Sequence, residues 1–449
     1  MPENKPKLTF ICMTEYGEIL DVCLRLKDEG YGVYMNVADP DHKKIGDGLV
    51  EKVTDWHQCI GKGYVWLFDG CSRGNLQDWL RSRGEKVFGG SELGDKLEND
   101  RQAGQRWFRK AGFNQPESFN FKDINSALEF IKKNADKKYI LKQNSDAPKS
   151  LNHLTKFPGS EDMIFHLEEL KMRWNESEYG KFDCDLMQVV EGIEIAASAF
   201  FNGTDYMKDD KGKVVGWLNF EHKKETDGDL GETTGEMGTL FYGCNETNKI
   251  FAKILMNPEI VRVLRKSGFR GIFDINGSLL PDGSFCAFEP TCRFGVPSTS
   301  YECLEAMEGN LGKVLAATAA GRQYPVFLKK GWGVVNVIAA KPYPVETDVP
   351  PEATSIGEKL WILERGKPIS DFTPEQKKHI HLENFYKEDG HYRVATKNGF
   401  LLTVTGTGKD IKTARENMLA YVKDNIYLPG MKYRQDIGKK IGELKKSVV

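Results

Sequence analysis

The chain has 449 residues, of which 40% are hydrophobic and 29% are charged, and its formal net charge is −2. This composition is typical of a globular protein of about three domains and gives no reason to expect bulk nucleic-acid binding. The nine cysteines are odd in number and form no Cys-x-x-Cys pair, which argues against a disulfide framework and favours a reducing cytoplasm. Because the sequence shows no signal peptide and no apolar run of membrane-spanning length, no membrane partner is expected.

The first hundred residues alternate short apolar strands with a helical pattern. Strands are predicted at Leu8–Met13, Gly32–Val37, Gly63–Phe68 and Lys86–Phe88, and a helix at Ile19–Glu29. Strands that alternate with helices predict a small parallel α/β domain over about residues 5–95.

The remainder of the chain mixes helices and strands. Helices are predicted at Leu97–Ala111, Ile124–Lys133, Phe251–Gly268, Leu304–Ala320 and Ile411–Ile426. Strands are predicted at Tyr139–Lys142, Asp183–Val190, Glu194–Phe201, Gly271–Leu280, Ser284–Glu289, Trp332–Ala340 and Gly399–Gly406. The polar, glycine-rich segment Glu221–Gly238 is predicted to be a long loop, and such loops are often functional.

Three of these segments could support phosphate and metal chemistry. Lys142 ends a buried strand and Lys149 follows it, so both could reach phosphate oxygens, although a solvated edge lysine is the alternative. Glu289 closes an apolar strand and Arg293 follows four residues later, which fits either a Mg²⁺ ligand with a phosphate-binding arginine or a structural ion pair.

The third segment is the glycine-rich stretch Glu221–Gly238. Its hydroxyl side chains Thr233 and Thr234, with the flanking glycines, could offer hydroxyls and backbone amides to an anionic substrate. The alternative is a loop that is only exposed to solvent.

Several motifs in the same order along the chain resemble those of one family. They are Lys86–Gly89, Leu97–Arg101, Glu221–Gly238, Glu289–Gly295, Asn398–Gly406 and Tyr433–Gly438. The family is glycinamide ribonucleotide synthetase (phosphoribosylamine–glycine ligase), whose members are ATP-grasp enzymes, and the likeness covers about residues 86–440. The resemblance implies mixed α/β and α+β structure: a Rossmann-like α/β domain preceding the ATP-grasp fold at residues 1–97, an ATP-grasp domain at 98–327, and a C-terminal α/β lobe at 328–449. It also implies a small nucleotide lobe at about residues 114–190.

The same resemblance assigns roles to single residues. ATP is expected to contact Arg101, Lys142, Lys149, Gln188, Val190 and Glu194; Mg²⁺ or Mn²⁺ is expected to be bound by Glu289 with Thr291 or Asn276. Arg293 and Lys142 are the expected catalytic residues, and the substrates are expected at Glu15, His222, Lys223, Thr233, Thr234 and Arg293.

The N-terminal loop departs from the family pattern. The family binds the phosphate of phosphoribosylamine with a glycine-rich loop containing an arginine, where this chain has Met13–Ile19 with Glu15 and Glu18 and no basic residue. Two carboxylates repel a phosphate, so a cationic or neutral amine suits this loop better. The family's glycine-rich phosphate lid is likewise replaced, by Asn144–Leu151.

The predicted function is an ATP-dependent ligase that joins a small carboxylate to an amine through an acyl-phosphate, with a changed acceptor. A genuine phosphoribosylamine–glycine ligase and a non-catalytic protein that binds a nucleotide or a partner are the alternatives. Only small-molecule substrates are expected as partners, with no nucleic acid, and the protein is expected to be a monomer or homodimer.

Overall fold

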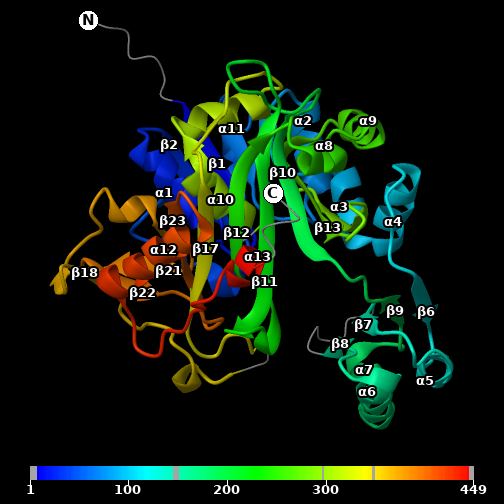
Figure 1. Ribbon diagram of the computed structural model, residues 1–449. Coiled ribbons are helices and arrows are strands. Elements are labelled where there is room, and N and C mark those ends of the chain that lie inside the picture. The colour runs from blue at the N-terminus through cyan, green and yellow to red at the C-terminus, as the bar shows by residue number, and fades with distance from the viewer. Residues whose placement is uncertain (1–7, 145–150, 296–297, 346–348, 444–449) are drawn as a thin grey trace, which may run out of the picture. The chain divides into compact units, whose positions relative to one another are not determined.

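The computed structural model describes residues 8–144, 151–295, 298–345 and 349–443 (Figure 1). The chain forms two compact units. The first comprises the described parts of Met1–Ala111, Ile195–Asn276 and Glu289–Val449, and the second comprises those of Gly112–Glu194 and Gly277–Phe288.

A five-stranded parallel sheet opens the first unit. Its strands are β1 (Thr9–Thr14), β2 (Gly32–Val37), β3 (Glu51–Lys52), β4 (Val65–Phe68) and β5 (Lys86–Phe88), joined in part by helices α1 (Leu20–Asp28) and α2 (Gly74–Ser82). The strand order is β3-β2-β1-β4-β5, and every neighbouring pair is parallel, as predicted. The order reverses between β1 and β4, and α/β sheets of this kind bind ligands beyond the carboxyl ends of the strands at such a point.

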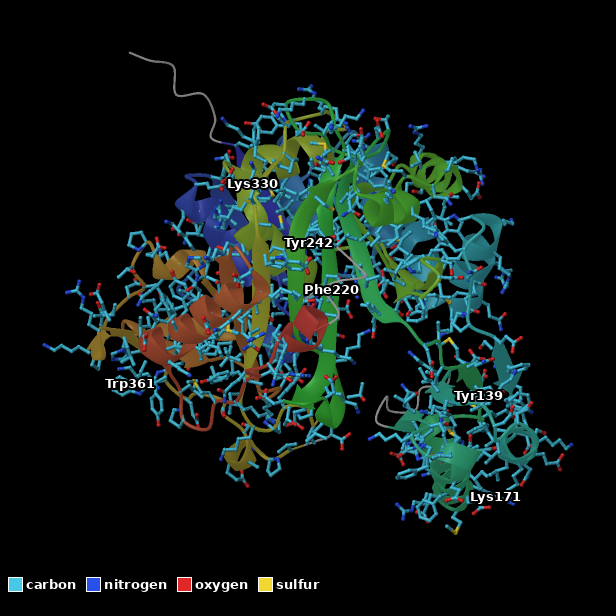
Figure 2. The ribbon with its side chains drawn as sticks, in the orientation of Figure 1. Tyr139, Lys171, Phe220, Tyr242, Lys330 and Trp361 are labelled. Carbon is cyan, nitrogen blue, oxygen red and sulfur yellow. The ribbon has the colours of Figure 1, made fainter. Side chains whose placement is uncertain are left out.

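A large mixed sheet forms most of the rest of the first unit. Its order is β14-β13-β10-β11-β12-β17-β23-β20. The bounds are β10 (Ile193–Asn202), β11 (Val215–Thr226), β12 (Leu230–Asn245), β13 (Arg270–Leu279), β14 (Phe285–Thr291), β17 (Trp332–Ala339), β20 (Ile380–Leu382) and β23 (Phe400–Gly408). Figure 2 shows Phe220 on β11 and Tyr242 on β12, whose rings lie 6.4 and 4.8 Å from that of Trp332 on β17. These aromatic contacts between strands hold the middle of the sheet together.

Helices and smaller sheets complete this unit. The helices are α3 (Glu92–Asn99), α4 (Arg101–Lys110), α8 (Lys249–Leu255), α9 (Pro258–Ser267), α10 (Ser298–Ala306), α11 (Leu311–Ala319), α12 (Ile411–Asn425) and α13 (Lys439–Glu443). The short strands are β15 (Met307–Glu308) with β16 (Phe327–Leu328), β18 (Trp361–Glu364) with β19 (Lys367–Ile369) and β24 (Ile426–Tyr427), and β21 (Phe385–Glu388) with β22 (His391–Val394). Within the described ranges, no helix has the length and apolar character needed to span a membrane.

The second unit has its own sheet and core. Four antiparallel strands in the order β6-β9-β7-β8 are β6 (Ser118–Phe121), β9 (Cys184–Gln188), β7 (Tyr139–Gln143) and β8 (His153–Leu154). The helices are α5 (Ile124–Lys133), α6 (Glu161–Arg173) and α7 (Glu176–Tyr179). Helix α5 begins where Asp123 accepts a hydrogen bond from the Ser126 amide, and it buries Ile124, Ala127, Leu128 and Ile131 at helical spacing. Figure 2 labels Tyr139, which is 1% exposed in this core, and Lys171 on the exposed side of α6.

Three helices predicted as continuous are interrupted in the structure. Leu97–Ala111 breaks at Asp100, whose carboxylate accepts the Ala103 amide at 3.0 Å and so begins α4. Phe251–Gly268 breaks before Pro258, which lacks the amide hydrogen that a helix interior requires. Leu304–Ala320 is α10, the short strand β15 and α11, with the chain turning at Gly309, whose φ is +89°.

The prediction that Glu221–Gly238 is a loop is wrong. The segment forms the paired ends of β11 and β12, with bulges near Lys224. The chain reverses at Asp227-Gly228-Asp229, where φ is +73° at Gly228 and +56° at Asp229. An Asp-Gly turn with positive φ matches the twist of a hairpin, so the polar composition here belongs to two paired strands, of which β12 is exposed next to the turn and β11 is mostly half-buried.

Candidate functional site

The second unit holds the residues predicted to bind the nucleotide. Lys142 on β7 is half-buried and lies opposite Asp185 on β9 in the antiparallel register. Gln188 ends β9, where its amide donates to the Glu117 carbonyl at 2.8 Å, and Val190 follows two residues later. Adjacent strands therefore hold the lysine and the predicted adenine-binding segment in one sheet.

Two further predicted nucleotide residues belong to the same part of the chain. Glu194 is exposed at the beginning of β10. Lys149 lies outside the described residues, as does most of the segment that replaces the family's glycine-rich lid.

In the first unit, the predicted metal ligands lie on neighbouring strands, β13 and β14. Asn276 is 5% exposed and donates through Nδ2 to Glu221 at 2.9 Å, and its buried Oδ1 has no hydrogen-bond partner among the described residues. Glu289 and Thr291 stand at the end of β14, where Glu289 is exposed and Thr291 is half-buried. Lys223 lies 3.0 Å from Glu221.

This set of oxygen atoms suits Mg²⁺. Mg²⁺ prefers oxygen ligands and is commonly held by one or two carboxylates together with substrate phosphates and water. The described residues contain no cluster of three or more His, Cys, Asp or Glu side chains that could hold a metal by itself. A carboxylate at Glu289 with the orphaned amide oxygen of Asn276 therefore fits a cation that arrives with a phosphate-bearing ligand.

A second carboxylate on β13 is buried behind these residues. Asp274 is 4% exposed and accepts a hydrogen bond from the Ser198 hydroxyl. Burial, with a smaller contribution from the charge of Glu221 and Glu289, raises the pKa of Asp274 to about 7. The raised pKa follows mainly from the removal of this carboxyl group from solvent.

Arg293 is paired with Glu98 on α3. Its Nε lies 2.8 Å from Glu98 Oε1, and its Nη1 donates to the Phe294 carbonyl at 2.8 Å. Glu98 also accepts the Cys292 amide at 3.1 Å, which fixes the carboxylate and so orients the guanidinium. Helix α3 can approach this closely because of Gly94, where a Cβ would lie 2.9 Å from that of Cys292. Burial raises the pKa of Glu98, which Arg293 opposes.

Arg101 begins α4 in the first unit. Its Nη1 atom is buried and has no hydrogen-bond partner within the described part of the chain. A buried guanidinium nitrogen without an acceptor is costly, and a phosphate oxygen would satisfy it. The contact between Arg101 and the nucleotide stays a prediction.

The predicted substrate residues on the hairpin are engaged within the chain. Thr233 accepts a hydrogen bond from Lys224 at 2.7 Å, and the Thr234 hydroxyl donates to the Lys223 carbonyl at 2.8 Å. His222 is 7% exposed, with Nδ1 3.2 Å from the Phe220 carbonyl and Nε2 accepting the Gly438 amide at 3.1 Å. Both nitrogens of the neutral ring are therefore engaged, Nδ1 within β11 and Nε2 with the C-terminal segment.

The pH dependence of stability is expected to report on His222. Burial, with a smaller contribution from Arg434, lowers the pKa of His222 from 6.5 to about 4. The neutral native ring therefore contributes stability that is present above pH 6.5 and is lost as the pH falls towards 4, by up to about 3 kcal/mol. In urea titrations between these pH values, a His222→Gln variant should lose less unfolding free energy than the unsubstituted protein. If the unfolding free energies of the two proteins fell by the same amount over this pH range, this role of His222 would be contradicted.

Sequence reasoning missed several side chains around Arg293. Glu98 lies within the motif Leu97–Arg101, but the sequence does not predict its contact with Arg293, because two residues so far apart in the chain leave no local pattern. Asp69 directly follows the apolar strand β4 at its carboxyl end, a position that could have identified it as a site residue. Glu15, which was predicted, forms an ion pair with Arg73.

The two units together have the ATP-grasp fold. A search for matching family models finds none. Phosphoribosylamine–glycine ligase of Leptospira interrogans is 24% identical over 372 residues, which cover 80% of this chain and 79% of that protein. The enzyme of the same name from Mycobacterium tuberculosis is 28% identical over 239 residues, about half of each chain.

Solved structures agree with the ATP-grasp fold. Phosphoribosylamine–glycine ligase of Thermotoga maritima superimposes with a TM-score of 0.68 at 20% identity, covering 96% of this chain and all of that one. Biotin carboxylase of Campylobacter jejuni gives 0.61 at 12% identity over 97% of this chain and 95% of that one. N5-carboxyaminoimidazole synthetase of Staphylococcus aureus gives 0.55 at 13% identity, covering 94% and 99%. The resemblance to phosphoribosylamine–glycine ligases and the predicted fold are confirmed.

Proposed function

We propose that this chain is an ATP-dependent carboxylate–amine ligase that forms ADP through an acyl-phosphate and uses an acceptor other than phosphoribosylamine. The observation that carries the proposal is the oriented Arg293–Glu98 pair, which follows directly on the carboxylate-bearing end of β14. The curated relatives that share this fold along most of the chain are named as carbon–nitrogen ligases, which supports the reaction class.

The residues of each unit take separate roles. Lys142 neutralises phosphate oxygens, and the segment at Gln188 and Val190 binds adenine through backbone groups, with Glu194 at the ribose. In the first unit, Arg101 offers its unpaired nitrogen to phosphate. Glu289 and Asn276 supply oxygen ligands for Mg²⁺, which would neutralise the negative charge of the triphosphate.

Arg293 acts at the reacting groups. Its guanidinium is held by Glu98, so it is already oriented for the charge that develops on the transferring phosphoryl group. In the second step the acceptor nitrogen forms a bond to the acyl carbon, the bond from that carbon to the phosphate oxygen breaks, and phosphate leaves with the electron pair. The nitrogen loses one proton to solvent, which leaves a neutral amide.

Amine-dependent ADP formation by the full chain tests this function. The assay supplies Mg-ATP, a panel of amino acids as carboxylates, and amines that include phosphoribosylamine. Glu289→Gln removes a ligand charge and is expected to lower the rate at least about tenfold, and Glu308→Gln, an exposed glutamate on β15, is the matched control. Unchanged ADP formation in Glu289→Gln would refute the metal assignment.

Nucleotide binding is measured separately. Saturating Mg-ATP at about 100 times its dissociation constant should stabilise the protein by about 2.7 kcal/mol in thermal unfolding. Absence of any shift would favour a non-catalytic protein that binds a partner and not a nucleotide. Efficient use of phosphoribosylamine would instead identify a genuine phosphoribosylamine–glycine ligase.

A further inference from the structure

The carboxyl ends of β1 and β4 place an acidic side chain at the point where the strand order of the parallel sheet reverses. The two strands pair in parallel, with Met13 opposite Phe68, so Thr14 and Asp69 are the next residues on each strand path. The loop after β1 carries Glu15 and Glu18. Ligands of α/β sheets bind at this position, which the sheet topology identifies independently of any charge.

Asp69 is buried there with an unused oxygen. Its side chain is 3% exposed, and Oδ2 has no hydrogen-bond partner among the residues that the structure describes. Burial, followed by the charge of Glu18, raises the pKa of Asp69 to about 7, while a hydrogen bond from Thr14 favours the charged form. A buried carboxylate with an orphaned oxygen is costly unless a ligand supplies a donor.

The nearby cations are already paired with other carboxylates. Arg293 lies 2.8 Å from Glu98, and Arg73 forms its ion pair with Glu15. Glu18 has no ion pair or hydrogen bond of its own within the described ranges. The charges of Arg293 and His42 act on it only through longer-range electrostatic attraction. Among the described residues, Glu18 and Asp69 are therefore the two carboxyl groups here that no cation pairs, and we call them the acidic pair.

We propose that the amine acceptor carries a positive charge beyond its reacting nitrogen and that the acidic pair binds this charged group. The proposal rests on the ligase function proposed above and names the substrate class of the same site. A primary ammonium has three donors and no acceptor, which matches the unused Asp69 oxygen and the carboxylate of Glu18. A phosphate placed there would be repelled by each ionised carboxylate.

Three amines that share one reacting group test this charge preference. Diaminobutane, aminobutanol and aminobutyl phosphate differ only in a distal cation, hydroxyl or anion. In calorimetric titrations of the full chain without nucleotide, diaminobutane is expected to bind about tenfold more tightly than aminobutanol, and aminobutyl phosphate more weakly than both. Equal binding of all three, or tightest binding of the phosphate, would overturn the proposal.

Substitutions assign the preference to the acidic pair. Asp69→Asn should reduce the ratio between diaminobutane and aminobutanol to about threefold or less. If Asp69→Asn does not fold, Glu18→Gln replaces it, because Glu18 is only half-buried; the same reduction of the binding ratio is expected. The matched control is Glu85→Gln, because Glu85 is also a buried carboxylate of this domain but is hydrogen-bonded to Trp66 at 3.0 Å; its ratio should stay near tenfold.

The outcomes separate the two proposals. If the ratio is unchanged in both Asp69→Asn and Glu18→Gln, the acidic pair does not bind the acceptor. If the ratio is near tenfold in the unsubstituted protein and is lost in those variants, but no amine stimulates ADP formation, the binding site stands and the ligase function fails. Because the titrations contain no nucleotide, they report on the acidic pair in either case.

Discussion

Replacing Arg293 with methionine is expected to lower amine-dependent ADP formation by about 10²–10³-fold. The guanidinium is fixed by Glu98 and by the Phe294 carbonyl, so the native protein does not have to reorganise it when charge develops on the transferring phosphoryl group. Arg293→Lys keeps the charge but loses the planar fork, so it should recover only part of the rate. The measurement is the rate of ADP release at saturating Mg-ATP, carboxylate and amine.

A surface arginine provides the matched control for this substitution. Arg262 on α9 makes two hydrogen bonds, of 2.7 and 2.6 Å, to Glu259 and is 60% exposed, so Arg262→Met also breaks an arginine–glutamate pair. Its activity should stay within about twofold, because surface ion pairs contribute little to the rest of the molecule. If Arg293→Met folds normally and retains more than about a third of the activity, Arg293 does not act in the reaction.

The acceptor end of the proposed site is acidic although two arginines lie near it. Both arginines are paired with carboxylates, Arg293 with Glu98 and Arg73 with Glu15. The loop after β1 supplies carboxylates in place of the glycines and arginine of the related enzymes. A cationic acceptor therefore compensates the charge of Glu18 and Asp69, whereas an anionic acceptor would add to it.

Local patterns were sufficient to predict the parallel sheet. Buried apolar runs such as Val65–Phe68 predict strands that are covered on both faces, and the structure places them in one parallel sheet. The ends of such strands carry the site because a chain that leaves a buried strand exposes polar groups at the same sheet edge. Asp69 stands at such a strand end, directly after β4, whereas Asn276 lies within β13 and is assigned only by the family resemblance.

Other features depend on contacts that a local pattern does not contain. The hairpin of β11 and β12 is largely polar near its turn, so its alternation of apolar residues is too weak to predict strands. The short strands from β18 to β22 have three or four residues each, too few for a periodicity to show. The residues that contact Arg293 and Asp69 come from distant segments of the chain. The burial that raises the pKa of Asp69 likewise depends on the whole fold.

Replacing Arg434 with methionine is expected to lower the unfolding free energy of the first unit by about 4 kcal/mol. Arg434 is 1% exposed, and its guanidinium donates to both oxygens of Asp436, at 2.8 and 2.9 Å, and to Asp229 at 3.0 Å. It also donates to the Lys224 carbonyl at 3.0 Å, which joins the C-terminal segment to the turn of the β11–β12 hairpin. Methionine would leave both carboxylates without this cation in a partly buried place. Urea unfolding followed by tryptophan fluorescence measures the loss.

The C-terminal segment is expected to hold the hairpin turn in place through this arginine. The Gln435 amide donates to Asp227 at 2.7 Å, and the Gly228 amide donates to Asp436 at 2.8 Å, so the turn is bound on both sides of Arg434. In Arg434→Met, limited proteolysis at the turn should therefore accelerate along with the loss of stability. The exposed Arg322 supplies the control, since Arg322→Met should change the unfolding free energy by less than about 0.5 kcal/mol. Equal stability of the two variants would mean that the hairpin is held by its own strand pairing and that the C-terminal contacts are incidental.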